Sequence, residues 1–498
     1  MDLLAFADIE RLRDDLVVAG YHYEGVADLL GPIAHQALSR NETTAGMRAT
    51  RDRSPLATLT RLWLLQATVT VADVEAALPG LVDRLCVAGL LERSVGEVRA
   101  RVDVRPYADE SRGWWVVSDL TPGLDGTDIR VGADHVLGIS SASTSLAQLT
   151  VREPVARALD LGTGSGIQAL HLAEHADHVV ATDVNERALA MTRLNASLNG
   201  ARIEDRAGSL YEPVAQDQFD LIVSNPPFVV SPATDERLVY RDSGLPGDEM
   251  VRRVVTGAAD HLRPGGRAQV LANWVHRAGQ PWQERIAGWV EGLVDGGGLD
   301  TWVVQREVAD PAEYVELWLK DAGVHGTEEY VERYDTWLSW FADQDIEGVG
   351  FGWVNLRRVE REPVVHAEEW PFAVEQPLGP EVAARARRTD LLADHPDLAG
   401  LHLVLREDVR QETGGRAGEA EPETIVLRQQ RGMRRAHQAD TVVAGFVGAC
   451  DGDLSVGQIL DALATLLERD GADLRGVYAG EIRDLVAEGF LDVVGDKG

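Results

Sequence analysis

The sequence predicts an α/β fold in which a doubly wound parallel sheet forms the middle of the chain and mainly helical modules flank it on both sides. Three observations support this prediction. From about residue 150 onward, apolar strand patterns alternate with helical patterns. A glycine-rich loop follows the first of these strands. Outside this region, apolar residues recur mostly at helical spacing.

Length and composition indicate a folded protein of several domains. The 498 residues are enough for about three domains, and 45% hydrophobic with 26% charged residues is typical of globular proteins. A net charge of -33 disfavours an extended nucleic-acid coat but still allows a local basic patch. We predict domains at residues 1–135, 136–362 with a helical insertion at about 308–345, and 363–498.

Cysteine usage and hydropathy indicate the compartment. Cys86 and Cys450 lie far apart in apolar stretches, which predicts neither a disulfide framework nor a metal site. We find no targeting segment, and no stretch approaches the roughly 18 apolar residues that span a bilayer. We therefore expect a cytoplasmic protein without a metal and without membrane contact. The sequence leaves the oligomeric state open.

Both ends of the chain resemble winged-helix modules. Helical segments from residue 56 onward precede two strand patterns, at 98–104 and 114–120, that a polar turn separates. Near the C-terminus, the segment LVAEGFLDV repeats the earlier LCVAGLLER. Such modules bind nucleic acid or serve as packing and docking units, and both interpretations stay open.

The central region alternates strands and helices, as a doubly wound sheet requires. Two amphipathic helical stretches, 311–323 and 328–341, interrupt this alternation before the last strand. Helical spacing alone explains Trp318, Trp337 and Trp340 in this insertion, so we predict core positions for them. The predicted strands are, in order, 156–162, 178–184, a third strand that ends before Gly208, 219–225, 267–275, 301–308 and 348–359.

The segment from 160 to 166 reads Asp-Leu-Gly-Thr-Gly-Ser-Gly between an apolar strand and an apolar helix. Glycines in this context let the backbone approach a ligand closely. A dinucleotide fingerprint would need glycine at position 167, where Ile167 stands. The candidate cofactor-binding residues of this loop are Asp160, Gly162, Thr163, Gly164 and Gly166.

This G-x-G-x-G spacing resembles class I S-adenosylmethionine-dependent methyltransferases, which have a Rossmann-like doubly wound sheet. The resemblance implies S-adenosyl-L-methionine (SAM) as cofactor, with the loop under its methionine part. Asp183 ends the next strand, 17 residues beyond Gly166, and is expected to accept hydrogen bonds from the ribose hydroxyls.

Four further residues complete the expected cofactor site. Ser209 and Leu210 follow the third strand, where similar enzymes hold the adenine, although an acid is more usual than serine there. Ser143 and Thr144 lie upstream, where related enzymes close over the methionine end. Capping of the next helix explains these two hydroxyl residues equally well.

The motif Asn225-Pro226-Pro227-Phe228 follows the fourth strand and indicates the chemistry. The lone pair of an amide or aromatic amine is delocalised, so methylation benefits from acceptors that bind the NH2 group. The Asn225 side-chain oxygen and the Pro226 carbonyl are such acceptors. The prolines stiffen the turn, and Phe228 offers a flat face to a planar substrate. We predict that all four residues are catalytic.

Two groups of methyltransferases share this resemblance. The segments NPPFVVSP and GLPGDEMVRRVV are similar to release-factor glutamine methyltransferases, which usually have tyrosine where Phe228 stands. Asn273 in the fifth strand, together with NPPF, is similar to ribosomal RNA guanine methyltransferases of the "methyltransferase small" group. Those enzymes commonly have a histidine where Val229 stands.

These observations predict a SAM-dependent N-methyltransferase that acts on an exocyclic base amine in ribosomal or other structured RNA. A glutamine methyltransferase of a protein of the translation apparatus, a SAM-binding regulator without turnover and a small-molecule amine methyltransferase are the alternatives. One arginine run either contacts RNA phosphates or forms a solvated face that neutralises nearby acids, and we favour the second interpretation. The run comprises Arg428, Arg431, Arg434 and Arg435.

Overall fold

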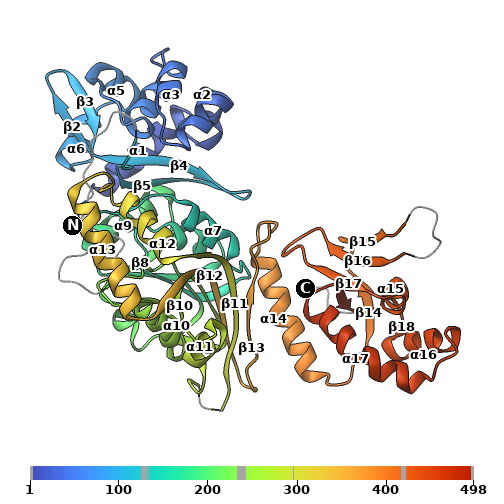
Figure 1. Cartoon of the computed structure of the whole chain (residues 1–498). Helices are drawn as coiled ribbons and strands as arrows, with labels where there is room; N and C mark the ends of the chain where they lie inside the picture. Colours follow the sequence, from blue (N-terminus) through green and yellow to red (C-terminus); the bar gives the residue numbers. More distant parts are fainter. Residues whose placement is uncertain are drawn as a thin grey trace. The chain divides into compact units, whose positions relative to one another are not determined.

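The computed structural model describes residues 4–124, 132, 134–232, 243–294, 296–416 and 422–494 (Figure 1). It divides into two compact units, one formed by residues 1–147 and 153–370 and the other by residues 148–152 and 371–498. The three-domain division given above stays a prediction. Within the described ranges, every helix is too short or too polar to cross a bilayer.

The N-terminal part of the first unit is mainly helical. Its three short strands form a separate sheet in the order β1-β3-β2. Helix α6 ends at Val87, and strand β2 follows. The winged-helix interpretation stays a prediction. The elements are α1 (Phe6–Val18), α2 (Tyr23–Leu38), α3 (Thr44–Ala49), α4 (Pro55–Leu59), the π-helix η1 (Thr60–Leu64), β1 (Val69–Thr70), α5 (Val71–Ala77), α6 (Val82–Val87), β2 (Leu91–Ser94) and β3 (Glu97–Ala100).

A hairpin links this part to the central sheet region. Strands β4 (Val102–Ala108) and β5 (Gly113–Asp119) pair antiparallel and form their own two-stranded sheet. Val104 and Val117 belong to the N-terminal core, whereas Trp114 and Val116 pack against the helix that follows the glycine-rich loop. The hairpin is therefore packed on both faces.

The central sheet has eight strands in the order β13-β11-β12-β10-β9-β6-β7-β8. The five strands from β8 to β10 are parallel, which confirms the predicted doubly wound α/β architecture. Strand order reverses between β6 and β9, where open α/β sheets bind ligands. The strands are β6 (Val155–Leu161), β7 (Ala176–Asp183), β8 (Ile203–Ala207), β9 (Phe219–Ser224), β10 (Leu262–Arg277), β11 (Gly298–Ala309), β12 (Ile346–Val359) and β13 (Val365–Glu369).

Strand β12 runs antiparallel to both neighbours, so the sheet is mixed and not wholly parallel as predicted. The inserted helices explain this difference. A single crossover helix carries the chain back to the end of the sheet where the previous strand began, so the next strand is parallel. The pair α12 (Pro311–Asp321) and α13 (Glu328–Asp343) instead returns the chain to the end where β11 finished, so the next strand is antiparallel. Val349 at the start of β12 accordingly lies beside Ala309 at the end of β11.

Helices cover the sheet and complete two cores. Leu159 and Leu161, two residues apart in β6, share a core with α10 and α11. Met191 and Leu194 of α9 instead join the N-terminal core. The remaining helices of this unit are α7 (Ser141–Leu149), α8 (Ile167–Leu172), α9 (Glu186–Asn199), the 3-10 helix η2 (Glu212–Val214), α10 (Glu249–His261) and α11 (Trp282–Val290).

The second unit has its own core, to which Phe446, Leu460 and Leu485 belong. Two small antiparallel sheets, β18-β14-β19 and β15-β16-β17, pack with four helices. The elements are α14 (Gly379–Asp394), β14 (His402–Leu405), β15 (Val409–Gly414), β16 (Thr424–Gln429), β17 (Ala436–Ala439), α15 (Thr441–Gly448), β18 (Asp451–Ser455), α16 (Val456–Leu466), α17 (Gly471–Ala487) and β19 (Leu491–Val493).

Candidate active site

Most of the predicted site residues lie at or just after the carboxyl ends of β6, β7, β8 and β9, which are four adjacent strands, whereas Ser143 and Thr144 lie on α7. Ser224 and Leu161 are register partners at the ends of β9 and β6. The buried Ser224 hydroxyl donates to the Leu161 carbonyl at 2.8 Å. This bond fixes the start of the NPPF motif relative to the glycine loop, by which we mean residues 162–166.

The glycine loop has a backbone that only glycine adopts without strain. Gly162, Gly164 and Gly166 have φ values of 77°, 56° and 84°. A Cβ atom built on Gly162 or Gly164 meets no described atom within 4 Å, whereas one on Gly166 would meet Thr192 at 3.1 Å. The open space above the first two glycines is a place that a ligand can fill, which fits the SAM expected there.

Asp183 connects the second strand to this loop. Its carboxylate accepts from the Gly164 N–H at 2.9 Å and from the Asn185 N–H at 2.8 Å. Burial raises the pKa of Asp183, although these backbone N–H groups act against the shift. Two bonds leave further lone pairs of a carboxylate available, so Asp183 can also accept from a ribose. The ribose assignment stays a prediction.

Asp160 binds both the glycine loop and the helix that follows it. It is 1% exposed, and one of its oxygens accepts from the Thr163 hydroxyl at 2.6 Å and from the Ala169 N–H at 2.9 Å. Burial raises the pKa of Asp160 to about 7, and the nearby charge of Asp183 adds to this rise. Asp160 therefore connects the Thr163 side chain of the loop to the backbone of α8, and the contact of Asp160 and Thr163 with a cofactor stays a prediction.

The hydroxyls upstream of the loop bond locally. The Ser143 hydroxyl accepts from the Ser140 N–H at 2.8 Å, and the Thr144 hydroxyl donates to the Ser140 carbonyl at 3.2 Å. The first contact is of the helix-capping type, whereas the second is a bond from a helical hydroxyl to the carbonyl four residues earlier. After β8, Ser209 is exposed, and Leu210 is half-buried with a φ of 48°. Cofactor contacts of these four residues are not tested by this geometry and stay predictions.

The NPPF motif presents unused acceptors. Within the described ranges, the Asn225 side chain and the Pro226 carbonyl make no hydrogen bond, and Asn225 is half-buried. Pro226 is buried and Pro227 is exposed. The Phe228 ring packs edge-on against Trp318 at a centroid distance of 6.5 Å. The motif thus keeps its polar atoms available while its aromatic ring is anchored.

The inserted helices hold the chain immediately after this motif, a role that the sequence did not indicate. The Val230 N–H donates to the Tyr314 hydroxyl at 2.8 Å, and the Trp337 indole donates to the Val230 carbonyl at 3.0 Å. Asn273 of β10 also donates to the Tyr314 hydroxyl, at 3.2 Å. Trp318 and Trp337 are 4% and 0% exposed, which confirms their predicted core positions.

Substitution of Asp183 tests the ribose assignment. We expect Asp183→Ala to weaken SAM binding by roughly 1.5 to 3 kcal/mol, because a carboxylate that accepts charge-assisted hydrogen bonds is lost. Calorimetry on Asp177→Ala is the matched control, since that exposed carboxylate lies at the other end of the same strand. An unchanged SAM dissociation constant in folded Asp183→Ala protein removes the residue from the cofactor site.

Substitution of Gly164 tests the space above the loop. We expect Gly164→Val to abolish SAM binding, because the side chain enters this space and strains a backbone with positive φ. Gly200→Val provides the control, since Gly200 also has positive φ and an open Cβ position but caps α9. If calorimetry gives the two variants equal affinities for SAM, the assignment of the glycine loop to the cofactor site is contradicted.

The buried carboxyl of Asp160 predicts a pH effect on stability. Burial holds the pKa of Asp160 at about 7 in the folded chain, above the ordinary value of 3.8. The native state therefore keeps a proton that the unfolded chain releases, and stability falls as pH rises between these values. We expect Asp160→Asn to gain stability relative to wild type across this window, by up to about 1.4 kcal/mol per pH unit. Urea unfolding at several pH values measures the free energy of unfolding of both proteins. If the two free energies change with pH in parallel, the prediction is wrong.

Comparison with known proteins agrees with this geometry. Residues 138–287 match the model of the methyltransferase small domain, and residues 18–101 match a domain of unknown function (DUF7059). Residues 138–287 include the glycine loop, Asp183 and the NPPF motif. Residues 18–101 cover most of the helical N-terminal part.

Curated relatives resemble the central part of the chain. A release factor glutamine methyltransferase from Geobacter sulfurreducens is 39% identical over 129 residues, which is 23% of this chain and 45% of that protein. Its counterpart from Xylella fastidiosa is 34% identical over 194 residues, 36% of this chain and 66% of that protein.

A second kind of relative matches the same part of the chain. Ribosomal RNA small subunit methyltransferase C of Cronobacter sakazakii is 30% identical over 193 residues, 36% of this chain and 49% of that protein. The chain thus spans between about half and two thirds of the length of these relatives. The match of its central segment, residues 138–287, to the methyltransferase small domain and the methyltransferases among its relatives support a SAM-dependent methyltransferase.

Proposed function

We propose that the whole chain is an N-methyltransferase that transfers a methyl group from SAM to a planar sp2 nitrogen. The observation that carries this proposal is the pairing of β6 with β9, which sets the free Asn225 amide beside a glycine loop with open space above it. A protein that only binds SAM does not need these free acceptors. The regulatory alternative is therefore less well supported.

The chain's own residues suffice for such a reaction. SAM supplies a methyl group on a positively charged sulfur. The Asn225 oxygen and the Pro226 carbonyl accept hydrogen bonds from the NH2 group of the acceptor and so orient its lone pair. Phe228, fixed by Trp318, borders the planar group. The nitrogen loses a proton to solvent after the transfer, so no general base is needed.

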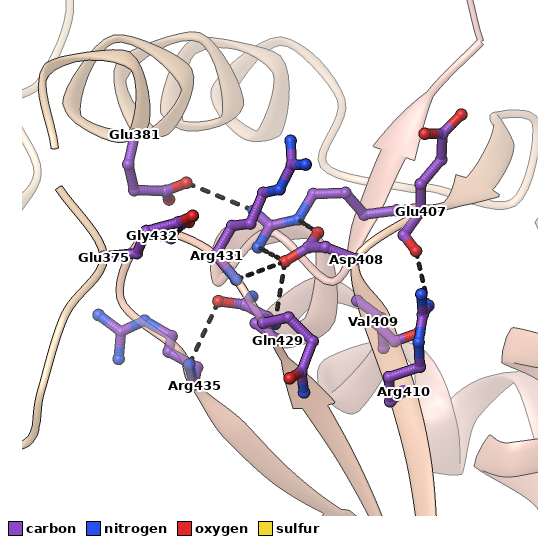
Figure 2. A network of polar contacts seen from close by, with 12 residues as sticks. Glu375, Glu381, Glu407, Asp408, Val409, Arg410, Gln429, Arg431, Gly432 and Arg435 are labelled. Carbon is purple, nitrogen blue, oxygen red and sulfur yellow. Dashed lines mark hydrogen bonds and ion pairs between the residues drawn. The ribbon is translucent and has the colours of Figure 1, made fainter. Parts of the chain in front are cut away.

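For the acceptor, we propose an exocyclic base amine in ribosomal or other structured RNA. The turn at residues 430–435, named here the arginine turn, supports this choice. Asp408 accepts from the Gln430 and Arg431 N–H groups, and Glu375 accepts from the Gly432 N–H (Figure 2). The carboxylates of Asp408 and Glu375 therefore hold the backbone of the turn by hydrogen bonds.

Only part of the arginine run stays available for phosphate. Arg428 pairs with Glu412 at 2.8 Å, as the solvated-face interpretation predicts, whereas Arg435 is 7% exposed and fits neither interpretation of the run. Arg431 and Arg434 are exposed and form no ion pair within the described ranges. Arg434 has a φ of 54°, a conformation that costs a residue with a side chain about 1 kcal/mol. Two charged side chains on a braced turn suit contact with an RNA backbone.

A glutamine side chain of a translation factor is the second candidate acceptor. The higher identity to release factor glutamine methyltransferases favours it, at 39% and 34% against 30% for the ribosomal RNA enzyme. The net charge of -33 also disfavours extended RNA contact. A primary amide carries the same planar NH2 group, so the role of Asn225 is unchanged.

Transfer of labelled methyl from SAM to fractions of a strain that lacks this chain separates the two acceptors. Label in RNA that digests to an N-methylated nucleoside supports the RNA proposal. Label in protein at a glutamine establishes the second candidate instead. If the chain binds SAM but no label appears in RNA, in protein or in the small-molecule fraction, the proposal that the chain is an enzyme is contradicted.

Substitution of Asn225 distinguishes transfer from cofactor binding. We expect Asn225→Ala to reduce the single-turnover transfer rate about a hundredfold or more, because a preorganised acceptor for the reacting NH2 group is lost. SAM affinity stays nearly unchanged. Asn225→Asp retains the oxygen and is the milder control. Transfer by Asn225→Ala at the wild-type rate refutes the mechanism.

A further inference from the structure

Helix α9 carries a buried polar stripe on an otherwise largely apolar helix. Thr192, Asn195 and Asn199 are 1%, 0% and 7% exposed. Their spacing of three and four residues places them on one face of the helix. Because buried amides and hydroxyls need hydrogen-bond partners, the contacts of the stripe define its function.

The two asparagines bind the edge of β5 as a neighbouring strand would. The Asn199 side chain accepts from the Trp115 N–H at 2.9 Å and donates to the Trp115 carbonyl at 2.8 Å. Asn195 repeats this pattern with Val117, at 2.7 Å and 2.9 Å. Residues two apart in a strand face the same side, so the i, i+4 spacing of the asparagines matches the spacing of their partners.

Two members of the stripe also contact the glycine loop. The Asn195 amide donates to the Ser165 carbonyl at 2.7 Å, and the Thr192 hydroxyl donates to the Gly164 carbonyl at 3.0 Å. Asn199 instead donates its additional bond to the Asn195 carbonyl, at 2.8 Å. The two central carbonyls of the loop are therefore held by side chains of α9.

Two N–H groups of the loop are also fixed. The Gly166 N–H, in the same peptide as the Ser165 carbonyl, donates to the Thr163 carbonyl at 2.9 Å, and the Gly164 N–H, in the preceding peptide, donates to Asp183. Rotation of the Ser165–Gly166 peptide plane would break a bond to α9 and a bond within the loop, and rotation of the Gly164–Ser165 plane would break the bond to Thr192. The positive φ values of Gly164 and Gly166 depend on these planes.

We infer that Thr192 and Asn195 are positioning residues for SAM: by holding the Gly164 and Ser165 carbonyls they preorganise the glycine loop, and Asn195 makes this geometry depend on the β4–β5 hairpin. The inference rests on the assignment of the loop to SAM. It places the hairpin, which lies outside the segment matched by the family model, among the elements that determine cofactor affinity.

The two asparagines provide a matched test. Asn195→Ala and Asn199→Ala each remove three hydrogen bonds, two of them to β5, but only the first removes a bond to the loop. We expect similar decreases in Tm for both. The SAM Kd, measured by calorimetry on the full chain, rises about 5- to 20-fold for Asn195→Ala and less than about twofold for Asn199→Ala.

Thr192→Val is a second, nearly isosteric variant that leaves all contacts with β5 in place. We expect its SAM Kd to rise about 3- to 10-fold, and it decides the question if Asn195→Ala does not fold. Equal weakening in both asparagine variants overturns the inference, as does an unchanged Kd in Thr192→Val. A wild-type chain that binds no SAM instead contradicts the cofactor assignment itself and overturns the inference with it.

Discussion

The hydrogen bond between the Ser224 hydroxyl and the Leu161 carbonyl joins the two strands on which the candidate site depends. Both groups are buried at the position where the order of the parallel strands reverses. Gly162 follows one partner in sequence and Asn225 follows the other. A displacement of either strand would therefore separate the glycine loop from the NPPF motif.

The surroundings of this strand pair hold each half of the site from a different side. Helix α9 and the β4–β5 hairpin fix the glycine loop through Asn195, whereas the inserted helices fix the chain after the NPPF motif through Tyr314 and Trp337. The Asn225 amide lies between these supports and is free of hydrogen bonds to the described residues. Rigid surroundings with a free acceptor are what preorganised catalysis requires.

The sequence predicted the parts of the site that follow from local pattern. Glycines at 162, 164 and 166 and the prolines at 226 and 227 lie at strand ends, where their backbone constraints have a clear meaning. The antiparallel direction of β12 was not predicted, because it depends on how two inserted helices return the chain. The roles of Asn195 and Tyr314 were also missed, since their partners lie 78 and 84 residues away in sequence. The buried polar residues in an Ala- and Leu-rich helix were the available signal for Asn195.

A crystal structure of the full chain with S-adenosylhomocysteine tests the central claim most directly. The account predicts that the ligand covers the open faces of Gly162 and Gly164, that its ribose hydroxyls donate to Asp183, and that its sulfur faces Asn225. A ligand bound away from the glycine loop, or one whose sulfur is directed away from the NPPF motif, would contradict the account.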